Sequence, residues 1–242
     1  MGLHRSGEAV VVLDAQAIRN LALRATELGT TRQYKGLTTG SDLAFAAAQS
    51  LTLKALRLKP LSPVQLGGGR NASGDIVLAW VRRARHSAEW RDLIDVPLDE
   101  TAESYEVDVF AGTAVSITAI TQAADGQFTT SGAHGLSVGS SLYAHSIGGM
   151  TQLNERAYIV ATVPSTTTFT VGENTTSYPA YTSGGSILKR KPSGVIAAST
   201  PTATYTSAQQ TTDYGGNQSN VRWAVQQISA RVGRGYPATA ST

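Results

Sequence analysis

Scattered histidines are the first candidates for chemistry in this 242-residue chain, and they stand at His4, His86, His134 and His145. No His-x-x-His or Cys-x-x-Cys spacing accompanies them, and zinc sites draw on such closely spaced ligands, so the pattern does not predict one. A histidine directly before Gly-Leu, as at position 134, favours a ring that ties a turn by hydrogen bonds. His134 and His145 could still meet across neighbouring strands, so a weak metal site formed by these two histidines remains an alternative.

Acidic side chains gather around Pro97, at Asp92, Asp95, Asp99, Glu100 and Glu103. Paired carboxylates can hydrolyse glycosides when rigid walls hold them face to face, and carboxylate oxygens can also bind calcium. This stretch is loop-like and lacks the regular spacing of a calcium loop, which favours a solvated acidic loop. Because no Gly-x-Ser-x-Gly nucleophile motif or phosphate loop occurs either, we expect no enzymatic activity and no cofactor. A cell-wall hydrolase is the least favoured alternative.

The only basic run contains Arg82, Arg83 and Arg85. On a strand, the first of these side chains would point to one face and the other two to the opposite face. One interpretation is a solvated strand end. The other is a contact with a partner, either an acidic subunit surface or an anionic cell envelope.

Tyrosines near predicted turns are the other candidates for partner or receptor contact, namely Tyr143, Tyr178 and Tyr181. Tyrosine offers a large rigid contact area with a polar tip, which suits protein or sugar recognition. The last two flank a proline in a predicted loop, so exposure is expected for them above all. Tyr158 and Phe169 lie on cleanly alternating strands and are expected in a core.

The composition favours a β-rich protein of one to three domains. Hydrophobic residues make up 41% of the chain and charged residues 15%, and there is no cysteine, which excludes disulfides and thiolate metal sites. A net charge of +3 is too small to indicate nucleic-acid binding. No apolar run reaches the length of a membrane span, and the first residues lack the apolar core of a signal peptide.

Apolar alternation predicts strands at residues 75–81, 104–110 and 220–228; it is strict in the first, and Ile228 breaks the phase of the last, which indicates a bulge. The set resembles a fibronectin type III sandwich, because Pro63 precedes it, Trp80 and Tyr105 lie on its strands, and Gly-Arg-Gly-Tyr-Pro at 233–237 closes it. The glycines at 67–69 predict a linker before this domain, and residues 207–210 a crossing turn.

Six further short strands are predicted at 114–120, 126–130, 140–144, 157–163, 167–171 and 184–189. This spacing is typical of a compact barrel or sandwich. The segments at 134–136, 147–154 and 181–185 resemble the first catalytic cysteine half-domain of ubiquitin-activating enzymes, a module that also recurs in bacteriophage tail proteins. Without a cysteine, that resemblance concerns shape alone.

The predicted fold is therefore all-β. A fibronectin type III-like domain, residues 61–115 plus 191–238, is interrupted by a small inserted β module, residues 116–190. A short β-rich segment, residues 1–60, precedes them. It includes a predicted buried strand at 9–13 and an ambiguous stretch at 14–28. The segment is too short for a core of its own, so we expect it to complete a hub or an oligomer.

The flanks of the insert, at residues 58–64, 74–85 and 226–235, resemble the carboxy-terminal region of the tail hub, or baseplate megatron, of siphophages and gene transfer agents. The chain lacks the large hub and glycoside-hydrolase-like regions usual in that family. The resemblance implies a structural protein at the distal end of the virion tail that takes part in assembly and host attachment. It also implies a homotrimer in contact with hub, distal-tail and fibre proteins and with a host surface receptor. A receptor- or saccharide-binding adhesion protein is the alternative.

Overall fold

The structure is a computed structural model that describes residues 25–36, 40, 42–85, 96–219 and 221–242. These residues divide into two units, one ending at Leu56 and the other running from Arg57 to Thr242. Antiparallel strands dominate both, so the predicted all-β class is confirmed. Within this described part, no helix is long and apolar enough to cross a membrane. The strand predicted at 9–13, most of the ambiguous stretch at 14–28, and His4, His86, Asp92 and Asp95 lie outside it.

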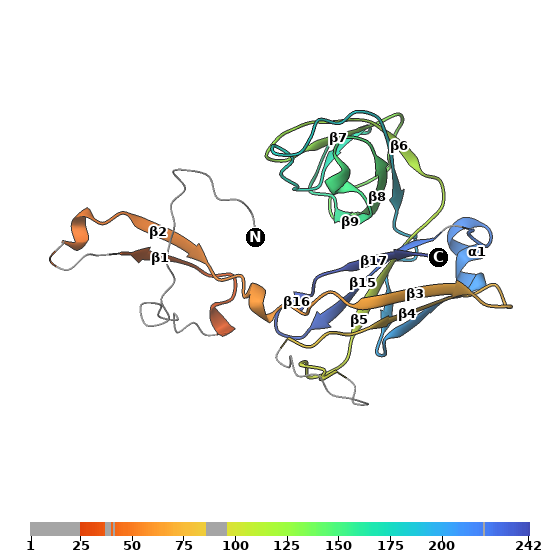
Figure 1. Ribbon diagram of the computed structural model, residues 1–242, viewed down its shortest axis with the longest axis horizontal. Helices are drawn as coiled ribbons and strands as arrows, with labels where there is room; N and C mark the ends of the chain where they lie inside the picture. Colours follow the sequence, from red (N-terminus) through yellow and green to blue (C-terminus); the bar gives the residue numbers. More distant parts are fainter. Residues whose placement is uncertain (1–24, 37–39, 41, 86–95, 220) are drawn as a thin grey trace. The chain divides into compact units, whose positions relative to one another are not determined.

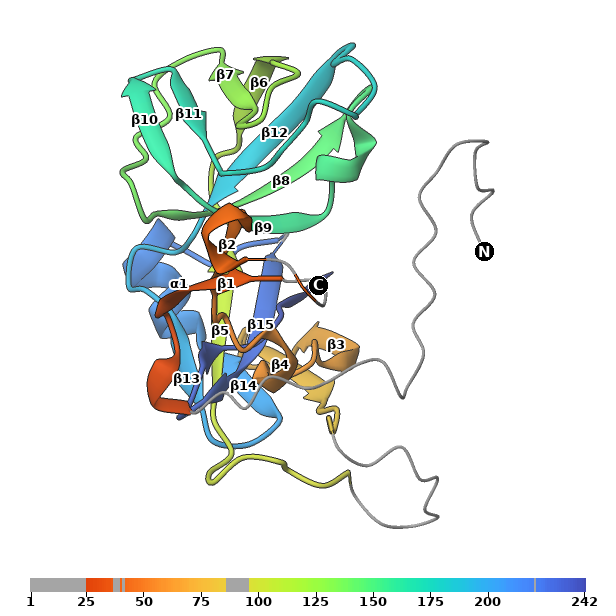
Figure 2. The same cartoon turned by 90° about the vertical axis from the view of Figure 1, so that its left-hand side faces the viewer.

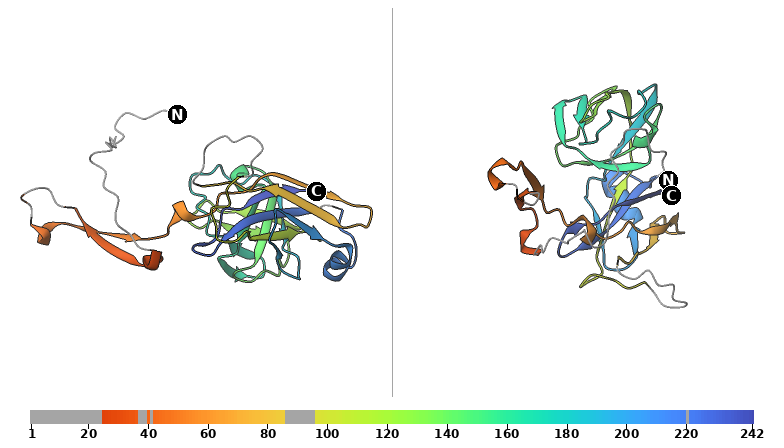
Figure 3. Two further views of the ribbon diagram at one scale, coloured as in Figure 1. Left: turned by 90° about the horizontal axis from the view of Figure 1, so that it is seen from below. Right: turned by 60° about the vertical axis from the view of Figure 1, so that its left-hand side comes forward.

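The first unit is a two-stranded ribbon, which Figure 3 shows in orange tones. Strand β1 (Thr31–Lys35) pairs with β2 (Ala48–Thr52), and the short 3-10 turns η1 (Ala25–Glu27) and η2 (Leu43–Phe45) accompany them. Every described side chain of the two strands is exposed or half-buried, and Phe45 is 89% exposed. An isolated two-stranded hairpin is at best marginally stable in water. The ribbon therefore gains stability from any surface that covers it.

The second unit begins with a two-sheet sandwich (Figure 1). After the turn η3 (Leu56–Leu58), one sheet has the order β14-β4-β3, made of Thr202–Tyr205, Ile76–Val81 and Val64–Arg70. The other has the order β13-β5-β15-β17, made of Ile196–Ala198, Tyr105–Phe110, Arg222–Ser229 and Ala238–Ser241, with the short β16 (Gly233–Arg234) hairpinned onto β15. A three-stranded sheet thus faces a five-stranded sheet, and the predicted all-β sandwich is confirmed.

Alternating burial fills the space between the two sheets. Along β4, Ile76, Leu78 and Trp80 are buried while their neighbours are exposed, as predicted. The Trp80 ring lies 5.1 Å from that of Tyr105 and 6.1 Å from that of Trp223, so three aromatic rings from both sheets meet in the centre. Packed aromatic groups of this kind dominate core energetics.

The prediction of a linker at the glycines of residues 67–69 is wrong, because these residues belong to strand β3. At Gly68, a Cβ atom would lie 2.6 Å from the side chain of Thr242 and 3.0 Å from that of Leu78. Glycine therefore serves here to let the end of the chain approach the strand closely.

The crossing turn predicted at residues 207–210 is also wrong, since helix α1 (Ser207–Tyr214) occupies it. Its start is fixed by a capping box, in which the Thr206 hydroxyl accepts from the Gln209 N–H at 3.1 Å and the Gln209 side chain accepts from the Thr206 N–H at 2.9 Å. Gly215, with φ of 78°, ends the helix in the left-handed conformation that favours glycine.

The insert is a small barrel between β5 and β13 (Figure 2). Its sheet has the order β10-β11-β7-β6-β12-β8-β9. These strands are Thr162–Ser165, Thr168–Thr170, Gln127–Thr130, Val115–Ile120, Gly184–Lys189, Ser141–Ile147 and Arg156–Ile159, and η4 (Thr151–Leu153) follows β8. Only Val160 and Ala161 separate β9 from β10 along the chain. The sheet therefore closes on itself through one bent segment, the one predicted as a single strand at 157–163.

Packing inside the barrel is apolar. The rings of Phe128 and Phe169 stack at 5.1 Å, and Leu142, Met150 and Leu153 are fully buried beside them. The first and last barrel strands, β6 and β12, are antiparallel neighbours, with Val115 opposite Ile187. The chain therefore leaves and re-enters the sandwich at adjacent points.

Candidate functional site

A cavity of about 310 Å³ lies at one end of the sandwich, where the β4–β5 connection meets the β15–β16 turn. We call it the loop-end cavity. Its lining residues are Leu58, Arg85, Asp99, Glu100, Thr101, Ser229, Ala230 and Arg231. The connection that carries four of them also carries the basic run and the acidic residues that the sequence singled out.

Two arginines of the predicted basic run pair with described residues of the acidic cluster. Arg82 pairs with Glu103 at 3.1 Å, and that carboxylate also accepts a hydrogen bond from the Tyr105 hydroxyl at 2.7 Å. Arg85 lies 2.6 Å from Glu100, with both side chains about nine-tenths buried. The interpretation of both segments as solvated is therefore wrong for these residues.

The expected strand alternation of the basic run is also wrong. Strand β4 ends at Val81, and both Arg82 and Arg85 turn into ion pairs, with 14% and 10% of their side chains exposed. Arg83 is exposed. Of the three arginines proposed for partner contact, it alone presents its side chain to solvent.

Asp99 and Arg85 fix the wall of the cavity. The backbone of Asp99 is in the left-handed region, with φ of 58°, which a non-glycine residue rarely adopts. Its carboxylate accepts from the backbone N–H of Arg85, and its carbonyl accepts from the Arg85 guanidinium at 2.8 Å. The same guanidinium also donates to the carbonyl of Leu58. These bonds hold two connecting segments of the sandwich together.

Tyr143 does not lie on an exposed surface, and that prediction is wrong. Only 1% of it is exposed, because it packs between the barrel and the sandwich and donates to Glu155 at 2.7 Å. Burial, together with this hydrogen bond, raises the pKa of the Tyr143 hydroxyl. The ring has no free face to offer a receptor.

Tyr178 and Tyr181 are half-buried against the barrel core, so their predicted exposure is wrong as well. The Tyr178 hydroxyl donates to Glu173 at 2.6 Å, and the Tyr181 hydroxyl donates to the carbonyl of Gly184 at 2.8 Å. The prediction that Tyr158 and Phe169 lie in the core is confirmed, with exposures of 7% and 0%.

His134 ties a turn, as predicted. It is 1% exposed, its Nδ1 accepts from the backbone N–H of Leu136 at 3.0 Å, and its Nε2 lies 3.1 Å from the carbonyl of Ser165. His145 lies on β8 opposite Ser186. The part of the chain that the structure describes contains no group of three or more histidine or acidic side chains that could hold a metal.

Asn154 and Gly149 account for the shape of the turn after β8. The Asn154 side chain accepts from the N–H of Ile147 at 2.7 Å and donates to the carbonyl of the same residue at 2.8 Å. At Gly149, a Cβ atom would lie 2.0 Å from the carbonyl oxygen of Ala180. The Ile-Gly-Gly-Met segment thus needs its glycine because two backbone segments touch there.

A buried junction joins the barrel to the sandwich. Phe110 and Ala224 of the sandwich pack against Tyr143 and Leu188 of the barrel, and Thr239 donates to the carbonyl of Glu155 at 2.8 Å. We call this set of contacts the junction. The junction buries Phe110 on the second face of β5.

Two ion pairs hold the chain where it leaves the barrel. Arg190 forms an isolated bridge with Phe110 and pairs with Asp108 at 3.3 Å, although burial raises the pKa of that aspartate. The next residue, Lys191, lies 3.9 Å from Asp213 of helix α1, and both side chains are almost fully buried.

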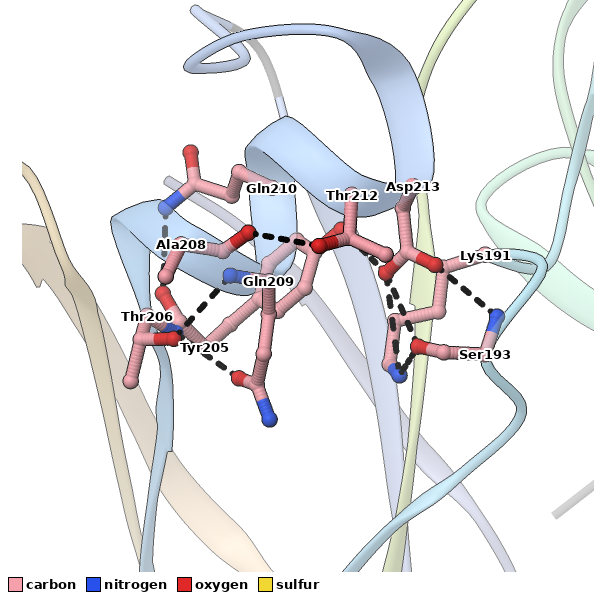
Figure 4. Close-up of polar contacts among 9 residues, drawn as sticks. All are labelled: Lys191, Ser193, Tyr205, Thr206, Ala208, Gln209, Gln210, Thr212 and Asp213. Carbon is pink, nitrogen blue, oxygen red and sulfur yellow. Dashed lines mark hydrogen bonds and ion pairs between the residues drawn. The ribbon is translucent and has the colours of Figure 1, made fainter.

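Figure 4 shows the surroundings of this second pair. Asp213 accepts from the hydroxyls of Tyr205 at 2.8 Å and Ser193 at 2.9 Å, and from the backbone N–H of Ser193 at 2.9 Å. Burial alone would raise the pKa of Asp213, but these hydrogen bonds outweigh it and lower the pKa. Burial also lowers the pKa of Lys191. The network pins the barrel's return segment to the helix.

Comparison with known proteins supports one part of this description. The family model of the ubiquitin-activating enzyme E1 FCCH domain matches residues 126–191, so the insert resembles that domain, as predicted. Curated proteins give no match. Among solved structures, domains d3-d4 of the rat CD45 extracellular region align with 100% of this chain and 79% of that chain. The identity is 7% and the TM-score 0.30, a likeness too low to bear on the fold.

Proposed function

We propose that this chain is a non-enzymatic structural component of a bacteriophage tail tip, at the distal end of the virion, where it contributes to tail assembly and host attachment. The observation that supports it most is the junction. A sandwich that carries a second β module on a buried, ion-paired contact is a stiff building block. The resemblance of the flanking segments to the tail hub family points to the same setting.

The exposed ribbon of the first unit supports a role in assembly. Its strands bury little by themselves, and the side chains of Leu43 and Phe45 are 56% and 89% exposed. Exposed apolar groups on an unsupported hairpin favour burial against other chains. The proposed partners are two further copies in a homotrimer and the hub, distal-tail and fibre proteins.

The paired carboxylates support a role without catalysis. Asp99 and Glu100, the two described acids that line the cavity, both bond to Arg85, and Glu103 pairs with Arg82. Glycoside hydrolysis needs one carboxyl group that can donate a proton and another aimed at the sugar ring. Zymography on host peptidoglycan with the purified chain should give no clearing, and clear lysis would contradict the proposal.

The proposed location of the chain at the tail tip is tested on purified phage particles. Antibody against the purified chain should label the distal tail end of phage particles in electron micrographs, and peptides of the chain should occur in the mass spectrum of purified particles. Light scattering of the chain alone should give the mass of a trimer. Absence of the chain from particles would contradict the proposal.

An adhesion protein that binds a receptor or a saccharide is the second candidate. The loop-end cavity favours it, because loops at the ends of β-sandwiches are common binding surfaces. Binding of the fluorescently labelled chain to host cells, with competition by unlabelled chain, tests it. Failure to bind cells that the phage infects would count against this candidate.

A further inference from the structure

The loop-end cavity contains polar groups that the fold itself does not use. The Arg85 guanidinium is occupied by Glu100 and by two backbone carbonyls. The side chains of Thr101 and Arg231, in contrast, make no hydrogen bond or ion pair with the described residues, and both are exposed. The cavity therefore presents a hydroxyl and a guanidinium that are available to a bound molecule.

Ser229 adds further bonding capacity. Its hydroxyl accepts from the backbone N–H of Arg231 at 3.2 Å, which leaves its own proton to donate. The Glu100 carboxylate, in contrast, is buried against Arg85 at 2.6 Å and belongs to the wall of the cavity. The lining thus combines donors and acceptors around one small space.

The charges in the lining balance. Two arginines, Arg85 and Arg231, stand against two carboxylates, Asp99 and Glu100, so the described lining residues have no formal net charge. An anion would meet the carboxylates and a cation the arginines, and like charges at short range are costly. A hydroxyl group suits this lining better, because it donates to one neighbour and accepts from another.

The volume of the cavity and its apolar residues restrict the class of ligand further. About 310 Å³ lies at the lower end of the range of small-molecule sites, roughly 300–1,000 Å³. Leu58 and Ala230 supply an apolar patch beside the polar groups. We infer that the loop-end cavity binds one sugar unit of a neutral saccharide. The patch would face the C–H groups of the sugar, and Thr101, Ser229 and Arg231 would bond its hydroxyls.

This inference deepens the attachment role proposed above, and the two can fail separately. Saccharide binding is measured on the purified full-length chain, whereas the place of the chain in the virion is measured on particles. A chain present at the tail tip that binds no sugar would refute only the inference drawn from the cavity.

Saturation-transfer NMR with the full chain is the test. The neutral probes are the methyl glycosides of glucose, galactose, rhamnose and N-acetylglucosamine, and glucuronic acid is the anionic probe. At least one neutral probe should bind with a roughly millimolar Kd, as expected for a ligand of about twelve non-hydrogen atoms. Glucuronic acid should bind more weakly than its neutral counterpart.

Two variants test whether the saccharide binds in the loop-end cavity. Arg231→Ala and Thr101→Val should each weaken binding of the neutral probe about tenfold, since each removes hydrogen-bonding capacity from the lining. Arg83→Ala is the matched control, an exposed arginine of the β4–β5 connection that does not line the cavity. Circular dichroism confirms that all three fold. The inference is overturned if no neutral probe binds, if only glucuronic acid binds, or if Arg83→Ala weakens binding as much as Arg231→Ala.

Discussion

The ring of Phe110, at the end of β5 in the sandwich, lies 5.6 Å from the ring of Tyr143, on β8 of the barrel, with an angle of 39° between the two planes. Both side chains are almost completely buried, at 0% and 1% exposure. The contact joins residues from two modules that each have an apolar core of their own. The barrel is therefore packed onto its host domain and is more than a tethered loop.

Phe110→Ala should destabilise the second unit by about 3–5 kcal/mol, the usual cost of removing a buried aromatic side chain. Loss of the ring should also separate the unfolding of the barrel from that of the sandwich, so calorimetry should show two transitions in place of one. Val138→Ala is the control, since Val138 is 67% exposed and its loss should change stability by no more than about 0.5 kcal/mol. An unchanged single transition in Phe110→Ala would show that the junction does not couple the modules.

Gly149→Ala should destabilise the barrel far more than Gly139→Ala. Both glycines have φ near +84°, at 83° and 84°, so alanine pays the same conformational cost at each, about 1 kcal/mol. Only at Gly149 would the new Cβ meet a backbone carbonyl oxygen, at 2.0 Å, whereas nothing lies within 4 Å at Gly139. Urea titration of both variants isolates the steric contribution. Equal losses would show that the turn can open without cost.

Asp213→Asn should lower the free energy of unfolding by about 3–5 kcal/mol at neutral pH, because it leaves Lys191 buried without its counter-ion. The pKa of Asp213 is lowered in the folded state, so the unfolded chain binds more protons at acidic pH. Its contribution is fully present above its ordinary pKa of 3.8 and is lost as the pH falls through the folded value.

Urea titrations at several pH values check this expectation. The difference between wild type and Asp213→Asn should shrink as the solution is acidified below the ordinary aspartate pKa. Asp125→Asn serves as the comparison, since that carboxylate lies on the barrel and accepts a single backbone hydrogen bond, from Gly172 at 2.9 Å. A constant difference across the acid range would mean that Asp213 does not act through its charge.

His145 should make the folded state sensitive to mild acid. Burial lowers its pKa below the ordinary value of 6.5, and the nearby Arg222 lowers it further. The unfolded chain therefore takes up the proton first, so stability should fall as the pH drops from 6.5 towards the folded pKa. His145→Gln should flatten the stability curve in that range. Parallel curves for the two proteins would refute the assignment.

Alternation along single strands made much of the fold predictable. Trp80 and Val107 each lie on a strand with one face towards a core, and a period of two identifies such faces without knowledge of the partner strand. Helix α1 was not predicted, although Thr206 and Gln209 have the spacing of a capping box, which indicates the start of a helix. A short polar helix carries little apolar pattern, so only its caps, the capping box and Gly215, signal it locally.

The candidate site was harder to predict because it depends on contacts between distant segments. Tyr143 is buried by a second module, and no local pattern indicates that the far side of β8 is covered. Arg85 and Glu100 stand fifteen positions apart, and no local pattern in the sequence predicts that they pair. The charged runs therefore identified the β4–β5 connection as the place of the candidate site. They wrongly predicted that its charged side chains are solvated.

The adjacent first and last strands of the barrel have a consequence for how the protein can evolve. A module whose first and last strands are neighbours needs only two adjacent attachment points in its host. Such a unit behaves as a cassette. Recombination can add, remove or replace it in a loop of a host sandwich while the host strands keep their register, so a surface can diversify without redesign of the scaffold beneath it.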